Sequence, residues 1–475
     1  MDTGPILVWL RQDLRLADHP ALDSALHAGT EAIPVYVLDE DSPWPLGGAS
    51  RWWLHESLAR LGAAMAAIGG RLILRKGATA EELARLAADT GARAVFWNRR
   101  YEAHERALED RVTNALRAGG VETRSFPGNL LFEPGSLPTK GGGEIRVFAA
   151  FWRSALSLPP PAFPLPAPER LPGPTRMAAR PALDDLGLVP CGGRTAAELA
   201  DTWTPGEEAA RSRLDGFLAD GLEVYAARRN HPALGGTSRL SPHLAFGELS
   251  PRQIWHAVAA RSPSHGAESF LREIGWREFS YFLLAAHPDL PSVPIRTEFA
   301  AFPWQSDETQ FAAWREGRTG FPIVDAGMRQ LWRTGWMHNR VRMIVASFLI
   351  KDMLMPWQAG EAWFRDRLVD ADLAVNATSW QWVAGCGTDA APYFRVFNPV
   401  LQGEKYDPLG QYVRRWIPEL APMSDLGIHR PWEAAPAALA AAGIRLGQNY
   451  PLPILDHVSA RRRALAAYNR VRGTG

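Results

Sequence analysis

The stretch GWMHNRVRMIVASFLIKDMLMPWQAGEAWFRDRLVDADLAVNATSWQWVAGCGTDAAPYFRVFNP, residues 335–399, decides how the C-terminal part of the chain folds. Its content of Trp, Met, Leu and Val is that of a protein core, yet polar side chains interrupt it. Burying an unpaired polar group is costly, so each of these side chains needs a partner inside the fold. A large cofactor with polar edges supplies such partners. The polar positions are Asn339, Arg342, Asp370, Asp372 and Asn376.

The spacing around Asn339 predicts a helix with one polar face. Asn339, Arg342 and Met343 stand at i, i+3 and i+4 and share that face, whereas we expect Arg340 to point elsewhere. On spacing alone, an ordinary core helix with an internal pair of Arg342 and Asp370 is equally consistent. Longer motifs are needed to decide between the two.

Composition excludes several classes of protein. The 475 residues leave room for two or three domains, and the net charge of +1 means that any nucleic-acid contact requires a local basic patch. The two cysteines, Cys191 and Cys386, cannot build a disulfide framework, and no Cys/His cluster has the spacing of metal ligands. No signal peptide is recognisable, and no apolar run approaches the ~20 residues of a membrane span. We therefore expect a cytoplasmic protein without a metal site.

The hydrophobic pattern divides the chain into three parts and predicts an α/β plus all-α fold. Residues 1–130 alternate strand-like and helix-like runs, which predicts an α/β domain with a doubly wound, five-stranded parallel sheet. Residues 131–205 are rich in Pro, Gly and Ala, which predicts an extended interdomain connector over the surface with no packed element. Residues 206–475 have helical periodicity throughout, and we expect an all-helical domain. The strand-like runs are ILVWL, IPVYVLD, RLILRKG, ARAVFWN and VETRSF.

Two further motifs in the helical part carry chemistry. The run TSRLSP, residues 237–242, places hydroxyls and backbone N–H groups before a helix that begins with proline, which makes an anion cradle, although alone it is more often a simple helix cap. Glu273, Trp276 and Arg277 stand at i, i+3 and i+4, so they share a helix face. A carboxyl, an indole and a guanidinium together suit a flipped-out base. A solvated ion-pair face explains Trp276 less well.

Four motifs decide the interpretation: GWMHNRVRMI, LVDADLAVN, SWQW and GTDAAPYFRVFNP. In this order they closely resemble the flavin-binding half of the DNA photolyase and cryptochrome family, and most of all its bacterial class I and class III members close to plant cryptochromes. The resemblance covers nearly the whole chain and implies FAD as the cofactor. It also implies that Arg342 pairs with Asp370 and that Asn376 faces the flavin N5. The cofactor-binding residues implied are Tyr225, Thr237, Ser238, Arg239, Leu240, Ser241, Phe270, Arg277, Trp336, Asn339, Arg342, Asp370, Ala371, Asp372 and Asn376.

The same resemblance implies the substrate and its contacts. Enzymes of the family that repair the (6-4) photoproduct carry two histidines where this chain has Asn339 and Met343, so the cyclobutane pyrimidine dimer is the expected lesion. His338 is adjacent to that position, not at it. The implied lesion-pocket residues, which we call catalytic, are Glu273, Trp276, Asn339, Met343 and Trp382. The implied DNA-binding residues are Arg229, Trp276, Arg277, Arg340, Arg395, Gln402 and Lys405.

Two accessory systems are also implied. Trp304, Trp357 and Trp380 stand where the family keeps three tryptophans that pass electrons from the surface to the flavin. The α/β domain is expected to bind an antenna chromophore, 5,10-methenyltetrahydrofolate, with 8-hydroxy-5-deazaflavin or a second flavin as alternatives. The candidate antenna residues are Glu105, Trp44 and Arg51, and His104 stands where the family usually has Asn beside Glu105.

The expected function is blue-light-driven repair of cyclobutane pyrimidine dimers in UV-damaged DNA by a monomer. Two alternatives stay open: a cryptochrome-like blue-light photoreceptor and a (6-4) photolyase. Plant cryptochromes place Asp where this chain has Asn376, and sensory members often carry a long tail after the last helix that we do not expect here. Both differences favour repair. A helical scaffold without flavin would leave the buried polar set unexplained.

Overall fold

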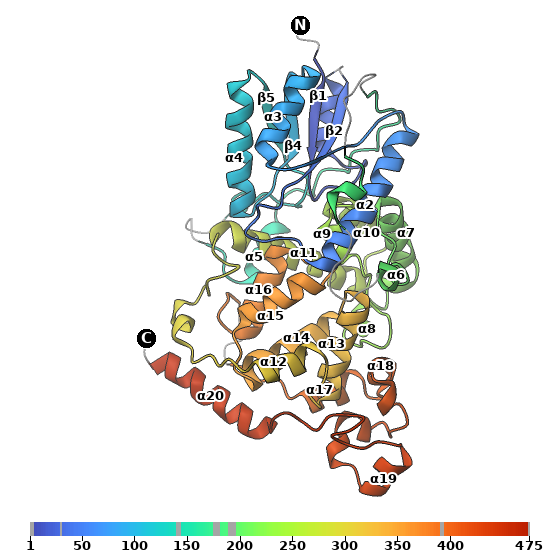
Figure 1. Cartoon of the computed structure of the whole chain (residues 1–475), viewed down its shortest axis with the longest axis vertical. Coiled ribbons are helices and arrows are strands. Elements are labelled where there is room, and N and C mark those ends of the chain that lie inside the picture. Colours follow the sequence, from blue (N-terminus) through green and yellow to red (C-terminus); the bar gives the residue numbers. More distant parts are fainter. Residues whose placement is uncertain are drawn as a thin grey trace.

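The computed structural model describes residues 4–28, 31–138, 144–173, 181–188, 196–389 and 394–473. Cys191 lies outside these ranges, and Cys386 is buried as a free thiol. Figure 1 shows the α/β domain at the top and the helical domain below it, with the C-terminal helix α20 (His457–Gly473) at the lower left.

The N-terminal domain is built on a five-stranded parallel sheet with the strand order β3-β2-β1-β4-β5. Its central strands are wholly buried because their residues are almost all apolar. The chain moves outward from β1 in one direction and then returns to the other side, so the sheet is doubly wound, as predicted. The strands are β1 Ile6–Leu10, β2 Ala32–Leu38, β3 Ile73–Lys76, β4 Ala94–Asn98 and β5 Glu122–Phe126.

Helices cover both faces of this sheet. On one face, Val8 and Tyr36 pack with residues of α1 (Pro20–His27) and α2 (Gly48–Ala67). On the other face, Trp9 and Val35 pack with residues of α3 (Thr79–Thr90) and α4 (Ala103–Ala118). Side chains alternate between the two faces along a strand, so each strand feeds two cores.

The connector is more structured than its composition predicted. Residues 148–155 form helix α5 (Phe148–Ala155), whose Phe148, Phe151 and Trp152 are buried against the helical domain. The prediction that residues 131–205 contain no packed element is therefore wrong for this helix. Four aromatic or apolar side chains at helical spacing outweigh the surrounding prolines. A second short helix, α6 (Ala196–Ala200), precedes the helical domain.

The helical domain confirms the all-α prediction. In the part of it that the structure describes, the β-structure consists of one isolated bridge between Leu446 and Tyr450. Helix starts follow the sequence rules: Ser250 caps its helix in a capping box with Gln253. The helices are α7 Glu207–Gly216, α8 Tyr225–Arg228, α9 Ser241–Ala245, α10 Pro251–Ala259, α11 His265–Ala286, α12 Glu308–Arg315, α13 Pro322–Thr334, α14 Asn339–Ser347, α15 Trp357–Arg367, α16 Leu373–Ala384, α17 Pro399–Tyr406, α18 Gln411–Trp416, α19 Pro436–Ala441 and α20 His457–Gly473.

Buried polar contacts hold the two domains together. The Trp53 indole N–H on α2 donates to Glu248 at 3.0 Å, and the backbone N–H of Gly206 donates to the same carboxylate at 2.7 Å. The fully buried Arg15 donates to the carbonyl oxygens of Gly247 and Gly128. Because these groups have no water contact, breaking one partner would leave the other unsatisfied, which fixes the domains relative to each other.

Candidate active site

A cavity of about 500 Å³ lies inside the helical domain, between α11, α14 and α16. We call it the central cavity. All five predicted lesion-pocket residues line it, which are Glu273, Trp276, Asn339, Met343 and Trp382. Most of the predicted cofactor residues line it as well: Tyr225, Ser238, Leu240, Ser241, Phe270, Arg277, Trp336, Arg342, Asp370, Asp372 and Asn376. Segments more than 100 residues apart in the chain thus meet at one space.

Some predicted residues lie outside this lining. The Arg239 guanidinium lies over the Trp336 ring, 4.9 Å from its centroid, so it contacts a residue of the lining. Ala371 is not part of the lining, although both of its neighbours, Asp370 and Asp372, are. Arg340 was expected to point away from this face, but it lines the cavity and its guanidinium lies 4.5 Å from the Tyr406 ring. That expectation was wrong because Arg340 lies on the first turn of α14, where its long side chain extends over the mouth.

The salt bridge predicted between Arg342 and Asp370 is confirmed. Arg342 Nη2 lies 2.8 Å from Asp370 Oδ2, and the Ser241 hydroxyl donates to the same oxygen at 2.6 Å. Arg342 Nε also donates to the carbonyl oxygen of Met337. The Asp370 side chain is only 2% exposed, so these partners replace the water contacts that it lacks. The three side chains tie α9, α14 and the segment before α16 into one wall.

Asp372 is held by two partners from different elements. Its Oδ1 accepts from the backbone N–H of Val375, which makes Asp372 the N-cap of α16. Its Oδ2 accepts at 2.8 Å from the hydroxyl of Tyr281 on α11. Burial, and then the charge of Asp372, raise the pKa of Tyr281, so this phenol remains a donor. The sequence analysis did not single out Tyr281, since a Tyr within an apolar helix carries no signal of its own.

Asn376 has a partner that the sequence did not reveal. Its Nδ2 donates to the Glu361 carboxylate at 2.9 Å and to the Glu361 carbonyl oxygen at 3.2 Å. With the amide N–H groups engaged, the carbonyl oxygen is the atom left to accept a hydrogen bond from a ligand. Glu361 is almost fully buried, and that burial raises its pKa.

Glu273 forms an ion pair at the mouth of the cavity. Arg229 Nη1 lies 2.6 Å from Glu273 Oε1, and the Arg229 guanidinium lies 5.4 Å from the ring of Tyr225. Burial, and then the charge of Glu273, raise the pKa of Tyr225, which keeps its hydroxyl as a donor. A substrate at the mouth therefore meets a carboxylate and a guanidinium side by side.

The lining fits a large polar cofactor. The hydroxyls of Thr378 and Thr388 line the cavity, are buried and have no hydrogen-bond partner among the residues that the structure describes. An unsatisfied buried hydroxyl is costly, so a ligand with polar edges is the natural partner. The size of the cavity, these two hydroxyls and the wall formed by Ser241, Arg342 and Asp370 suit FAD.

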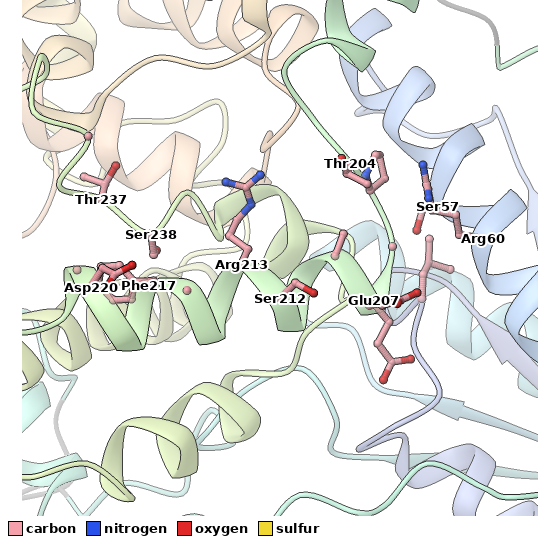
Figure 2. Close-up of a pocket in the computed structure, with 18 of the residues that line it drawn as sticks. Ser57, Arg60, Thr204, Glu207, Ser212, Arg213, Phe217, Asp220, Thr237 and Ser238 are labelled. Carbon is pink, nitrogen blue, oxygen red and sulfur yellow. The ribbon is translucent and has the colours of Figure 1, made fainter.

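A second, larger cleft of about 1110 Å³ opens between the two domains, and we call it the outer cleft. Figure 2 shows Ser57 and Arg60 on α2 on one side, the loop with Thr237 and Ser238 on the other, and Arg213 of α7 between them. Thr237 lines this cleft and not the central cavity, whereas Ser238 lines both. The predicted anion cradle thus lies where the two spaces meet. Most of the predicted lesion-pocket and cofactor residues line the smaller, central cavity.

The three predicted electron-transfer tryptophans belong to one core cluster. Trp380 lines the central cavity and is 2% exposed, Trp357 is 1% exposed, and Trp304 is partly buried at the edge of the cluster. Trp304 is thus the most exposed of the three. Gly360 makes room for Trp380, because a Cβ there would lie 2.2 Å from its ring.

The antenna candidates and three of the DNA-binding candidates lie outside the lining of the central cavity. Glu105 pairs with Arg11 at 2.9 Å, Arg51 pairs with Glu40 at 2.8 Å, and the Trp44 ring lies 5.0 Å from the guanidinium of Arg365. Neither cavity described above is lined by the three antenna candidates. Arg395 and Gln402 line a smaller groove beside α17, and Lys405 is exposed on that helix.

His338 does not line the central cavity. It is the N-cap of α14, where its Nδ1 accepts from the backbone N–H of Arg340. Burial, and then the neighbouring Arg340, lower its pKa to about 3, so the imidazole is neutral. This agrees with the prediction that it stands beside the relevant position.

Lys351 is a buried ammonium beneath the loop that carries Arg395. Its Nζ donates to the Arg395 carbonyl oxygen and lies 4.5 Å from the Phe394 ring. Burial lowers its pKa from 10.5 to about 7. Between these values the unfolded chain binds more protons than the folded one, so this group makes the protein more stable as pH rises from 7 toward 10.

We expect Lys351→Met to remove this dependence. The difference in unfolding free energy between wild type and variant should shift in favour of the wild type by about 2 kcal/mol between pH 7 and pH 9. Urea unfolding at both pH values measures it, with Lys405→Met, an exposed lysine, as the control. A difference that is the same at both pH values would show that Lys351 is not the titrating group.

The described residues offer neither a cluster of metal ligands nor a membrane-spanning helix. No group of three or more His, Cys, Asp or Glu side chains in the described ranges is arranged to hold a metal ion. Within the same ranges, none of the helices combines the length and apolar character needed to cross a membrane.

Two protein-family models match the sequence. The model described as "DNA photolyase" matches residues 6–169, and the model described as "FAD binding domain of DNA photolyase" matches residues 270–470. The first covers the sheet domain and the second covers most of the lining of the central cavity.

Individual relatives match over nearly the whole chain. A deoxyribodipyrimidine photo-lyase of Agrobacterium fabrum is 50% identical over 100% of this chain and 99% of its own length. Cryptochrome-1 of Arabidopsis thaliana is 40% identical over 96% of this chain and 69% of its own length. The crystal structure of a bacterial class III photolyase from Agrobacterium tumefaciens is similar to this structure with a TM-score of 0.96, at 49% identity, covering 100% of this chain and 98% of that one.

Proposed function

This chain belongs to the DNA photolyase and cryptochrome family, and from that premise we propose that it is a deoxyribodipyrimidine photo-lyase that uses blue light to repair cyclobutane pyrimidine dimers in DNA. The observation that carries the proposal is the central cavity, in which the five lesion-pocket residues and most of the predicted flavin residues line a single space of about 500 Å³. A lesion at the mouth and a cofactor inside would be in contact there.

The cofactor is FAD, and the chain's own residues hold it. The chemistry that FAD supplies when bound is light-driven donation of one electron to the dimer and its recovery after the ring opens. Arg342, Asp370 and Ser241 form a preorganised polar wall, and the oxygen of Asn376 would accept a hydrogen bond from the cofactor. These groups hold their geometry without the ligand because each already has a protein partner.

The lesion is bound by the lesion-pocket residues at the mouth of the cavity. Trp276 and Trp382 offer aromatic faces for the two bases of the dimer, and Glu273 hydrogen-bonds to the base edges. Asn339 and Met343 take the positions where (6-4) enzymes carry histidines, which favours the cyclobutane dimer. Asn376 and the complete lesion pocket favour repair over a purely sensory role.

The basic residues around the mouth are proposed to contact DNA phosphates. Arg340 is fixed there by Asn230, which accepts from its Nη2 at 2.7 Å, and by the Tyr406 ring. Arg229, Arg395, Gln402 and Lys405 complete the set. Binding through phosphate contacts of this kind weakens as the salt concentration rises and does not depend on the base sequence.

Three accessory features complete the proposal. Trp304, Trp357 and Trp380 pass electrons to oxidised FAD, which the position of Trp380 in the cavity lining and the greater exposure of Trp304 support. The α/β domain carries the antenna, 5,10-methenyltetrahydrofolate, for which Glu105, Trp44 and Arg51 are the candidate contacts. The protein is proposed to act as a monomer in the cytoplasm, and the free thiol of Cys386 suits that reducing compartment.

Glu273→Ala tests the proposed lesion pocket. Hydrogen bonds to a charged group contribute about 1.5–3 kcal/mol, so the repair yield per absorbed photon should fall about tenfold or more. Binding to dimer-containing DNA should weaken less, because stacking and phosphate contacts remain. Glu268→Ala, an exposed Glu on the same helix, is the matched control and should change neither quantity. Equal losses of binding and yield would contradict the role given to Glu273.

A further inference from the structure

We propose that Phe148 and Asp389 are positioning residues that hold Trp276 and Trp382, the two aromatic walls of the lesion pocket, at the spacing a pyrimidine dimer requires. The inference rests on the proposed function, because it takes Trp276 and Trp382 as the surfaces that meet the lesion. It assigns to the connector helix α5 a part in substrate recognition that its position in the sequence does not suggest.

Phe148 lies flat against Trp276. The two ring centroids are 3.9 Å apart and the planes differ by 9°, which is a face-to-face contact over the whole ring. Phe148 is 2% exposed, whereas Trp276 is only partly buried and lines the central cavity. One face of Trp276 is therefore covered by a rigid aromatic ring. Its indole cannot rotate about χ1 without displacing Phe148 from the core.

Asp389 links this pair to the second wall. The Trp382 indole N–H donates to the Asp389 carbonyl oxygen at 3.1 Å. The Asp389 carboxylate accepts from the backbone N–H of Phe148 at 3.3 Å. That N–H stands at the first turn of α5, where no helical carbonyl is available to it. A continuous path of contacts thus runs from Trp382 through Asp389 and Phe148 to Trp276.

The docking of α5 explains why Phe148 can reach this position. Gly275, directly before Trp276 on α11, has no side chain, and a Cβ there would lie 2.5 Å from the Trp152 ring. Trp152 therefore packs directly onto the α11 backbone. Phe148 stands one helical turn earlier and is parallel to Trp152, with 12° between the planes. The close approach at Gly275 thus sets Phe148 against Trp276.

Fixing the two indoles before the lesion arrives reduces the entropy lost on binding. A base stacked on an aromatic side chain stabilises the complex, and ordering that side chain during binding cancels part of this stabilisation. Undamaged DNA does not enter the cavity, so its affinity for the protein does not depend on how Trp276 and Trp382 are held. The quantity that Phe148 and Asp389 control is therefore discrimination between dimer-containing and undamaged DNA.

The test measures dissociation constants for dimer-containing and undamaged oligonucleotides in darkness, with the FAD-loaded protein. Phe148→Leu keeps the site apolar but removes the flat ring, and should weaken binding to the dimer about tenfold with binding to undamaged DNA unchanged. FAD absorbance should also be unchanged. Phe151→Leu is the matched control, since Phe151 lies in the same helix and is fully buried against Phe279 and Phe282, not against Trp276.

A double-mutant cycle with Trp276→Ala separates positioning from general stability. If Phe148 acts through Trp276, Phe148→Leu should have almost no further effect on dimer binding in the Trp276→Ala background. An equal loss in both backgrounds, or an equal loss in Phe151→Leu, would overturn the proposal. If Trp276→Ala itself leaves discrimination unchanged, the proposed lesion pocket fails and the inference falls with it, an outcome distinct from failure of Phe148 alone.

The carboxylate is tested separately. Asp389 has a φ of 52°, so Asp389→Gly removes the side chain without straining the backbone, and Asp389→Asn keeps an oxygen that can accept from Phe148. We expect Asp389→Gly to lose discrimination between dimer-containing and undamaged DNA and Asp389→Asn to retain it. Full discrimination in Asp389→Gly would remove Asp389 from the proposal.

Discussion

Asp370→Ala should reduce the affinity for FAD by roughly 100-fold, which would leave the purified protein nearly colourless. The variant removes the partner of Arg342 and the acceptor of Ser241 at the same time. Losing one member of a buried ion pair costs about 3–5 kcal/mol, and we take the lower end because the Arg342 side chain is 23% exposed. Flavin absorbance after dialysis and titration of the apoprotein with FAD both measure the loss.

Two variants control this experiment. Asp425→Ala removes a carboxylate that is 53% exposed and pairs with Arg414 far from the cavity, so it should bind FAD normally. Asp370→Asn keeps an acceptor for Ser241 but loses the charge, so its affinity should fall between those of wild type and Asp370→Ala. Normal FAD content in Asp370→Ala would contradict the assignment of this wall to the cofactor.

Trp380→Phe should slow light-driven reduction of oxidised FAD by at least about tenfold. Trp380 lines the central cavity and is buried, so in the proposed chain it is the tryptophan next to the flavin. Phenylalanine preserves most of the packing, but its ring is not oxidised as an indole is, so it cannot pass the electron on. Repair by protein that has been reduced chemically should be unchanged, because that reaction does not use the chain.

The control for this variant is Trp314→Phe. Trp314 is fully buried in the same core cluster, and its indole N–H donates to the Val345 carbonyl oxygen. It has no place in the proposed electron path, so photoreduction should proceed at the wild-type rate. Photoreduction that is equally slow in Trp314→Phe, or unchanged in Trp380→Phe, would show that electrons reach the flavin by another route.

Much of the fold was predictable because it depends on local patterns. The strands of the sheet are short runs of buried apolar residues between helices, and alternation of that kind leaves few topologies. The face of α14 that carries Asn339, Arg342 and Met343 follows from spacing alone. The pairing of Arg342 with Asp370 came from the resemblance, and the structure confirms it.

What the sequence could not predict depends on contacts between distant segments. Helix α5 was missed because prolines surround it, and its burial is decided by Gly275, more than 100 residues later. Glu361 and Tyr281 carry no recognisable motif, and their roles follow from meeting Asn376 and Asp372 in space. Arg340 was misplaced because helical spacing describes where a side chain starts and not how far it extends.

The most direct test of the account is the content of thymine dimers in an oligonucleotide incubated with the FAD-reduced protein, in blue light and in darkness. We predict that dimers disappear in the light and persist in the dark, with intact thymines recovered. Dimers that persist in both conditions, in the presence of a yellow protein whose flavin still photoreduces, would contradict repair of this lesion and favour a sensory role or the (6-4) photoproduct.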